Sequence, residues 1–126
     1  MNPLTQEWVA KAEGDFATAG RELSVTTNPN YDAICFHAQQ CIEKYLKARL
    51  QEAGIQFSKT HDLAALLDLI LSIEPNWAAM RADLQALTAF AVAYRYPGDS
   101  ADESEAQEAM VKCRDVRQII RTALNL

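Results

Sequence analysis

The sequence predicts an all-α protein, an up-and-down bundle of four to five helices, and two observations support this prediction. Apolar residues recur every three or four positions almost throughout the chain, which is the spacing of one face of an α-helix. No stretch alternates apolar and polar residues for long enough to form a convincing strand. The connections are short and contain no linker or repeat, so we expect residues 1–126 to form a single helical domain.

The first predicted helix covers residues 4–23, where the apolar side chains fall on one stripe. The second runs from about Tyr31 to Ala53 and is the longest, about 35 Å at 1.5 Å per residue. An Asn in the segment Asn28-Pro29-Asn30 can cap its free amides. Gly54 suits the left-handed conformation that often ends a helix.

The remaining predicted helices cover residues 63–71, 77–94 and 101–124. Thr60 or Asp62 is a suitable cap for the first of these, and Pro75 separates it from the next. Arg95-Tyr96-Pro97-Gly98 then ends a helix, because Pro cannot continue it and Gly turns readily. The last helix has acids near its start and bases near its end, which complements the helix dipole. A basic stripe that contacts RNA is the functional alternative for its second half.

The composition restricts the class of protein. The chain is 49% hydrophobic and 23% charged, which predicts a globular core. A net charge of −5 argues against broad binding to the DNA backbone, while leaving room for a local basic pocket. The uncharged run Leu84–Tyr94 is too short to span a membrane, and Met1–Leu4 lacks a basic segment followed by an apolar stretch, so we expect no secretory signal. Cys35, Cys41 and Cys113 lack CxxC spacing, so we expect reduced core thiols in a cytoplasmic protein.

Several familiar catalytic and cofactor signatures are absent. There is no GxxxxGK[ST], GxGxxG, HExxH or Glu-x-x-His pattern, so neither a common phosphate loop nor a di-iron bundle is indicated. His37 and Cys41 are one helical turn apart and could share a metal, but two ligands are too few for a zinc site. We therefore expect no metal and no cofactor.

The polar side of the second helix is the most informative surface. Its side chains fall at i, i+3, i+4 and i+7, which places Gln40, Glu43, Lys44 and Lys47 on one surface. Spacing alone most simply indicates a solvated face held by weak ion pairs. The functional alternative is that these residues form the wall of a cleft.

Two segments of the chain resemble the HEPN domain family: FHAQQCIEKYLKA at residues 36–48 and KTHDL at residues 59–63. The residues Trp8, Ala12 and Asp15-Phe16 in the first helix, and Arg95-Tyr96-Pro97 after the fourth, are similar to the family as well. The resemblance covers nearly the whole chain. Neither main segment is a catalytic signature, so they indicate the family more securely than they indicate an activity.

The resemblance implies an all-α HEPN bundle that forms homodimers with a cleft at or near the interface. Many HEPN proteins act in toxin–antitoxin systems, and small ones are often paired with a minimal nucleotidyltransferase. Catalytic members are metal-independent ribonucleases that use an Arg followed four to six residues later by a His, contributed by both protomers. Arg can grip a phosphate with two hydrogen bonds, and His can move a proton near neutral pH.

This sequence departs from the catalytic pattern at one decisive place. Arg95 matches the Arg, but the residues four to six positions later are Asp99, Ser100 and Ala101. The Tyr that follows the His in toxin-type members has no match either, since Tyr96 directly follows Arg95. The resemblance therefore favours a binding protein over an enzyme.

We expect a homodimeric module that binds a nucleotide or an RNA phosphate, or that serves as a platform for a nucleotidyltransferase. Arg95 would hold the phosphate, with further site candidates His61, Lys44, Lys47, Gln40, Glu43 and Tyr96. One alternative is a ribonuclease that uses Arg95 with His61. In that case His61 must lie beside Arg95; otherwise we expect it to hydrogen-bond across to the second or fourth helix. A second alternative is a purely structural dimerisation subunit.

Overall fold

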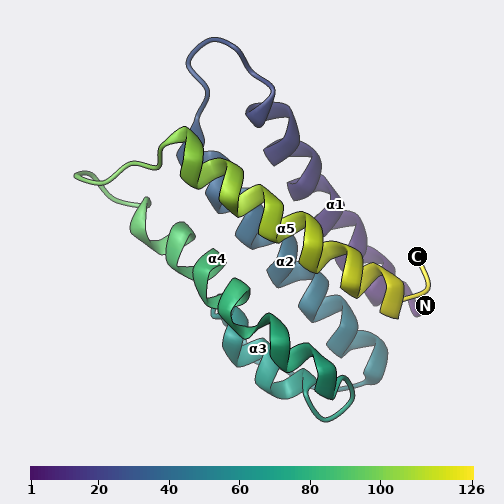
Figure 1. Cartoon of the computed structure of the whole chain (residues 1–126). Helices are drawn as coiled ribbons and strands as arrows, with labels where there is room; N and C mark the ends of the chain where they lie inside the picture. The colour runs from purple at the N-terminus through teal and green to yellow at the C-terminus, as the bar shows by residue number, and fades with distance from the viewer.

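The computed structural model describes all residues from Met1 to Leu126 and is entirely helical. Its helices are α1 (Pro3–Leu23), α2 (Tyr31–Ala53), α3 (Leu63–Ile70), the 3₁₀ helix η1 (Pro75–Met80), α4 (Arg81–Ala93) and α5 (Glu103–Ala123). In Figure 1, α1 and α4 run in one direction along the bundle, while α2 and α5 run in the other. The predicted all-α, up-and-down arrangement is confirmed.

Helix α2 lies at the centre of the bundle and contacts α1, α3, α4 and α5 (Figure 1). The buried hydrophobic side chains of the protein form one continuous cluster, and α2 supplies a third of it. These α2 residues are Ile34, Cys35, Ala38, Cys41, Ile42, Tyr45, Leu46, Ala48 and Leu50. A helix with neighbours on most of its sides leaves only a narrow strip for solvent, and that strip defines the candidate site.

The ends of α2 and α3 lie where the capping signals predict. The Asn30 side chain accepts a hydrogen bond from the Ala33 amide at 3.0 Å, and Gly54 ends α2 with φ +70°. For α3 the cap is Asp62, whose carboxylate accepts from two backbone amides; Thr60 instead accepts from the Asp62 amide. Both helices are therefore fixed at the ends that border the α2–α3 loop.

The predicted helix 77–94 is partly wrong. The chain forms the 3₁₀ helix η1 over Pro75–Met80, and α-helical geometry begins only at Arg81. Glu74, the residue before η1, makes no side-chain cap bond, and Pro75 in the first turn has no amide to donate. Tighter 3₁₀ turns are common at such poorly capped helix starts.

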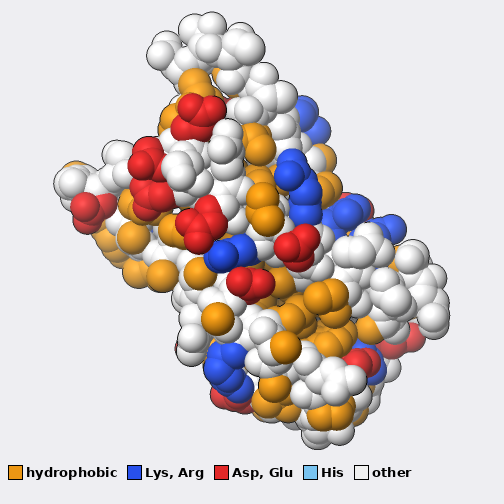
Figure 2. Space-filling model, in the orientation of Figure 1, with side chains coloured by type: hydrophobic (Ala, Val, Ile, Leu, Met, Phe, Trp, Pro, Cys, Tyr) orange, Lys and Arg blue, Asp and Glu red, His pale blue; other side chains and the backbone are white.

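The three cysteines are free and buried, as predicted. None of the helices combines the length and apolar character needed to cross a membrane. Figure 2 shows acidic side chains gathered over the first half of α5 and the loop before it. The acids of this region are Asp99, Asp102, Glu103, Glu105 and Glu108.

Candidate functional site

The solvent-facing strip of α2 is narrow and continuous. Between Ile34 and Ala48, only Phe36, His37, Gln40 and Lys44 are not buried. They are separated by one, three and four residues, so they line one side of the helix. We call these four residues the α2 strip.

Two predicted members of the polar surface, Glu43 and Lys47, are instead buried, with 4% and 7% of their surface exposed. The expectation of one exposed face that includes them is therefore wrong. The Lys47 ammonium donates to Glu43 at 3.0 Å and lies over the rings of Trp8 and Phe57, 5.6 and 6.0 Å from their centroids. Trp8 belongs to α1 and Phe57 to the α2–α3 loop. The spacing of residues along α2 therefore cannot predict that these two rings lie against Lys47.

The Glu43 carboxylate is the centre of this buried polar cluster. Burial acts to raise its pKa, but hydrogen bonds from Lys47, His61 and Gln39 outweigh burial and lower the pKa below 4.5. Glu43 is therefore ionised near neutral pH and compensates the Lys47 charge inside the bundle.

His61 forms two hydrogen bonds with residues of α2. This agrees with the prediction that His61 hydrogen-bonds across to the second or fourth helix. Its ring Nδ1 donates to Glu43 Oε1 at 2.9 Å, and its backbone carbonyl accepts from Gln39 Nε2 at 2.9 Å. The side chain is nevertheless 74% exposed, so the ring stands at the surface with one nitrogen fixed. A carboxylate that holds Nδ1–H leaves Nε2 available to another partner.

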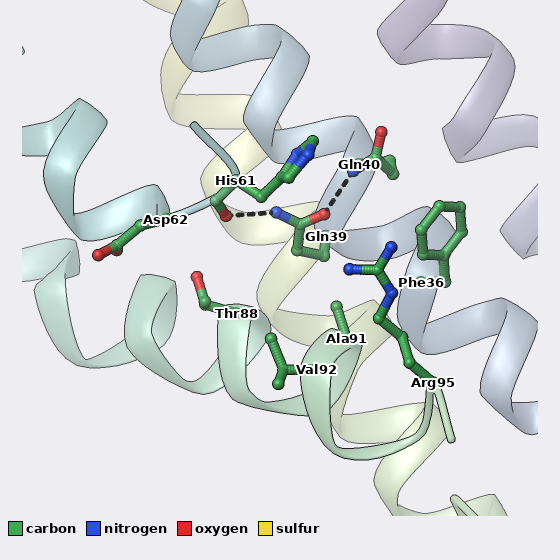
Figure 3. A pocket seen from close by; sticks show the side chains of 9 residues that line it. All are labelled: Phe36, Gln39, Gln40, His61, Asp62, Thr88, Ala91, Val92 and Arg95. Atoms are coloured by element: carbon green, nitrogen blue, oxygen red, sulfur yellow. Dashed lines mark hydrogen bonds between the residues drawn. The ribbon is translucent and has the colours of Figure 1, made fainter. Parts of the chain in front are cut away.

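A pocket of about 320 Å³ opens between α2 and α4, and Figure 3 shows it from close by. Its lining residues are Phe36, Gln39, Gln40, His61, Asp62, Thr88, Ala91, Val92 and Arg95. Arg95 follows the last turn of α4, and its guanidinium points back across the pocket toward Phe36 (Figure 3). Arg95 is exposed, and its side chain makes no hydrogen bond or ion pair within the chain, so all the guanidinium donors are available.

The structure brings three of the predicted site residues together: Arg95, His61 and Gln40. The other four lie elsewhere. Glu43 and Lys47 lie in the buried polar cluster, Lys44 turns toward α1, and Tyr96 is 69% exposed outside the pocket lining. The sequence reasoning did not single out Phe36 as a site residue, although its position one turn before Gln40 on the same side of α2 is a usable signal.

Lys44 and His37 share a carboxylate from α1. The Lys44 ammonium lies 2.5 Å from Asp15 Oδ2, and His37 Nδ1 donates to Asp15 Oδ1 at 2.8 Å. The Asp15 side chain is 10% exposed, whereas those of Lys44 and His37 are 23% and 29% exposed. Asp15 thus orients two nitrogen-bearing side chains whose remaining donors and acceptors face solvent.

Three of the four basic residues in the second half of α5 form ion pairs with neighbouring acids, and Arg114 is the exception. Arg117 and Arg121 both bind Glu13 of α1, at 2.6 and 3.1 Å, and Lys112 lies within 3.5 Å of Asp83. The hydrogen bond from Arg117 keeps the pKa of Glu13 below its usual value. These contacts favour the structural interpretation of that stripe over the RNA-binding alternative.

The pocket therefore combines one free guanidinium, one exposed aromatic ring, the histidine ring, two side-chain amides, the Asp62 carboxylate at its rim and the apolar side chains of α4. Such a set can hold an anion attached to a flat, partly apolar group. No group of three or more His, Cys, Asp or Glu side chains is placed to hold a metal ion.

Comparison with known proteins identifies the family. The model of the HEPN domain matches residues 5–123, nearly the whole chain. The chain belongs to the HEPN domain family. Among solved structures, this HEPN domain is similar to ST0689, described as an archaeal HEPN homologue, with a TM-score of 0.75 and 24% sequence identity. The match covers 94% of this chain and 96% of that one, which shows a shared HEPN fold. No curated protein matches the sequence.

Proposed function

We propose that this HEPN domain is a binding module that holds a nucleotide or an RNA phosphate in the pocket between α2 and α4. The observation that supports the proposal most directly is the unpaired guanidinium of Arg95, which points into a pocket lined by no other Lys or Arg. An Arg without an internal partner offers the planar fork that matches two oxygens of one phosphate.

The rest of the pocket suits the remainder of a nucleotide. Its volume of about 320 Å³ is at the small end of the range for small-molecule sites. Phe36 is 39% exposed and provides a ring on which a base can stack, and Gln40 provides an amide for a polar edge. His61, fixed by Glu43, faces the same space and offers Nε2 as a second polar contact.

Replacement of Arg95 by Ala tests the proposal. Loss of a charge-assisted pair should weaken binding about 10- to 100-fold, measured by calorimetric titration with nucleotides and with short RNAs. Arg114→Ala is the matched control, because Arg114 is exposed on α5 and has no ion pair. If Arg95→Ala binds as tightly as the wild type, the role assigned to Arg95 is wrong.

A metal-independent ribonuclease is the second candidate, because Arg95 and His61 line the same pocket. Cleavage needs a group that moves a proton, and His61 is the only histidine in the lining. We expect purified protein to leave both a structured and an unstructured RNA intact. Cleavage by the wild type that disappears in His61→Ala would replace the binding proposal with this one.

We also propose that the module acts as a homodimer, and that a minimal nucleotidyltransferase is its protein partner. Support for a helix–helix contact comes from α4, which carries no charged residue between Asp83 and Arg95 and exposes Ala89, Val92 and Ala93. An uncharged helix face of this kind is typical of a packed surface. An adjacent short nucleotidyltransferase gene whose product co-purifies with this chain would support the partner.

A further inference from the structure

We propose that Cys41 of α2 and Cys113 of α5 form a redox latch: a low-molecular-weight disulfide, such as oxidised glutathione, converts the two thiols into a disulfide that fastens the central helix to the last helix. Disulfides of this kind inside cells are typically transient and respond to redox conditions. Neither cysteine lines the pocket at Arg95, so the latch is separate from the proposed binding function.

Two hydrogen bonds mark how α2 and α5 lie alongside one another. Near the start of both helices, the backbone amide of Ala101 donates to Asp32 Oδ1 at 2.7 Å. Further along, Arg121 Nη1 donates to the Tyr45 hydroxyl at 2.9 Å. The two helices run in the same direction (Figure 1). The residues between these two bonds therefore follow one another in the same order on both helices.

Cys41 and Cys113 meet within this stretch. Cys41 lies one helical turn before Tyr45, and Cys113 lies two turns before Arg121. The Cys41 thiol is hydrogen-bonded to the Cys113 thiol, and both side chains are completely inaccessible to solvent. Two thiols in contact across a helix pair are already close to the arrangement that a disulfide requires.

The neighbours of the two cysteines allow the helices to approach closely. Ala38 lies one turn before Cys41 on the same side of α2, and Ala109 lies one turn before Cys113 on the same side of α5. Both alanines are fully buried. Because the distance between packed helices depends on the size of the side chains at the contact, small residues here bring the two backbones together.

The reaction is a thiol–disulfide exchange in two steps. One thiolate of the pair attacks a sulfur of oxidised glutathione, the S–S bond breaks, and one glutathione leaves as a thiolate that takes up a proton. The second thiolate then attacks the protein sulfur of this mixed disulfide and releases the other glutathione in the same way. In total, two protein thiols lose two electrons and two protons, and one small disulfide gains them as it becomes two thiols.

Burial determines when this exchange begins. The hydrogen bond from Cys113 and burial both raise the pKa of the Cys41 thiol, and a protonated thiol is a poor nucleophile. Exchange therefore starts only when α5 separates locally from α2. A core position has no room for an attached glutathione, so closure of the bundle favours its expulsion by the second cysteine. The latch thus forms after an opening event and prevents the next one.

Cys35 is the internal comparison for this pair. It is also fully buried, but it lies near the start of α2, where its charged neighbours are Glu105, Asp32 and Asp102. These acids repel glutathione, which carries carboxylates of its own. Cys35 also has no thiol beside it to resolve a mixed disulfide. We therefore expect oxidation to select the other two cysteines.

Peptide mapping of the oxidised protein tests the pairing. The wild type is incubated with oxidised glutathione at neutral pH, quenched with acid and digested with chymotrypsin without reduction. Chymotrypsin cuts after Phe36 and so separates Cys35 from Cys41. The main product should be one cross-linked pair of peptides that contains Cys41 and Cys113, with Cys35 unmodified. Stable glutathione on Cys41, or a main disulfide that includes Cys35, would overturn the latch.

Thermal unfolding tests whether the closed bundle accepts the bond. Oxidised wild type should unfold about 10 °C above the reduced protein, because the cross-link closes a loop of about 70 residues, and dithiothreitol should reverse the rise. Cys41→Ala and Cys113→Ala should show no rise relative to their own reduced forms. Cys35→Ala removes another fully buried thiol and should keep the rise. A cross-link that leaves the unfolding temperature unchanged or lowers it would contradict the proposal.

The rate of oxidation tests the need for opening. Urea below the unfolding transition should speed the exchange, because it raises the population of locally opened protein. In fully denaturing urea the selectivity should disappear, and Cys35 should react as well. An oxidation rate that does not change with urea would contradict gating by helix separation. None of these measurements involves a ligand, so their outcome is independent of the binding proposed for the pocket.

Discussion

At the scale of single residues, Glu43 carries more interactions than any other side chain in the protein. One of its carboxylate oxygens accepts from Gln39, Gln40 and His61, and the other accepts from Lys47. Because His61 belongs to the loop before α3, this one carboxylate ties that loop to the central helix. The position of the pocket rim therefore depends on a residue that does not line the pocket.

Removal of the Glu43 charge should be costly. In Glu43→Gln, Lys47 becomes a buried charge without a counter-charge, and the free energy of unfolding should fall by about 3 kcal/mol. Urea denaturation measures this change. Glu108→Gln is the control, because it breaks the Glu108–Lys112 pair on the exposed surface of α5 and should cost less than about 0.5 kcal/mol. Equal effects of the two substitutions would contradict the role of Glu43.

The difference in free energy of unfolding between the wild type and Glu43→Gln should change with pH in one direction. The pKa of Glu43 is lower in the folded protein than in the unfolded chain, so its contribution is complete above about pH 4.5. As pH falls through the lowered pKa, Glu43 becomes protonated and the contribution is lost. The stability gap between wild type and Glu43→Gln should therefore be constant near neutral pH and shrink in acid. A gap that widens below pH 4 would contradict this assignment.

At the scale of elements, the start of α5 depends on a reciprocal cap. Asp102 accepts from the Glu105 amide at 2.8 Å, while the Glu105 side chain accepts from the Asp102 amide at 3.2 Å. The other Glu105 oxygen accepts from the Tyr94 hydroxyl, which links the end of α4 to the start of α5. The exposed α4–α5 loop that carries Arg95 is thus closed at its base by one capping unit.

Asp102→Ala should reduce stability by about 1 kcal/mol, because it leaves an amide of the first turn of α5 without a partner. Asp99→Ala removes the same charge from the same loop but makes no cap bond, so its effect should stay within about 0.5 kcal/mol. Thermal unfolding of both variants measures the difference. If Asp99→Ala lowers stability more than Asp102→Ala does, the charge of the loop and not the helix cap determines the stability of the α4–α5 connection.

Local sequence signals predict the helices well where an end is fixed by the chain itself. α2 runs exactly from Tyr31 to Ala53 because its boundaries depend on Asn30 and Gly54, which act within a few residues. The 3₁₀ start at Pro75 is different, since a three-four apolar pattern fits both kinds of helix. The pattern predicts which side is buried, while the hydrogen-bond register depends on how the first turn is capped.

The site is less predictable because it depends on neighbours distant in sequence. The family motif identifies Arg95, and His61 is the one histidine that could replace the missing His of the motif; both line the pocket. Spacing along α2 places Glu43 and Lys47 beside Lys44, but it does not show that the rings of Trp8 and Phe57 lie against the Lys47 ammonium. Helical periodicity specifies the direction of a side chain and contains no information on what lies over it.

At the scale of the whole molecule, the uncharged stretch of α4 between Asp83 and Arg95 exposes Ala89, Val92 and Ala93 and is the surface where we propose the dimer contact. In light scattering after size-exclusion chromatography, we expect a dimer at micromolar concentration. Ala89→Glu should shift it to monomer without a change in helicity, since a charge at an apolar helix contact is left without a partner. Ala10→Glu, on an exposed position of α1, is the matched control. A wild-type monomer would contradict both the dimer and a cleft shared between protomers.

The three buried cysteines can serve as natural probes of local unfolding. Cys35, Cys41 and Cys113 are fully inaccessible, and burial raises the pKa of the Cys35 thiol to about 12. Alkylation needs an exposed thiolate, so each residue should react only when its helix separates from its neighbours. Cys41 and Cys113 report on the contact between α2 and α5, and Cys35 on the start of α2. Pulsed alkylation read by mass spectrometry would thus map which parts of the bundle come apart first, without introducing any label.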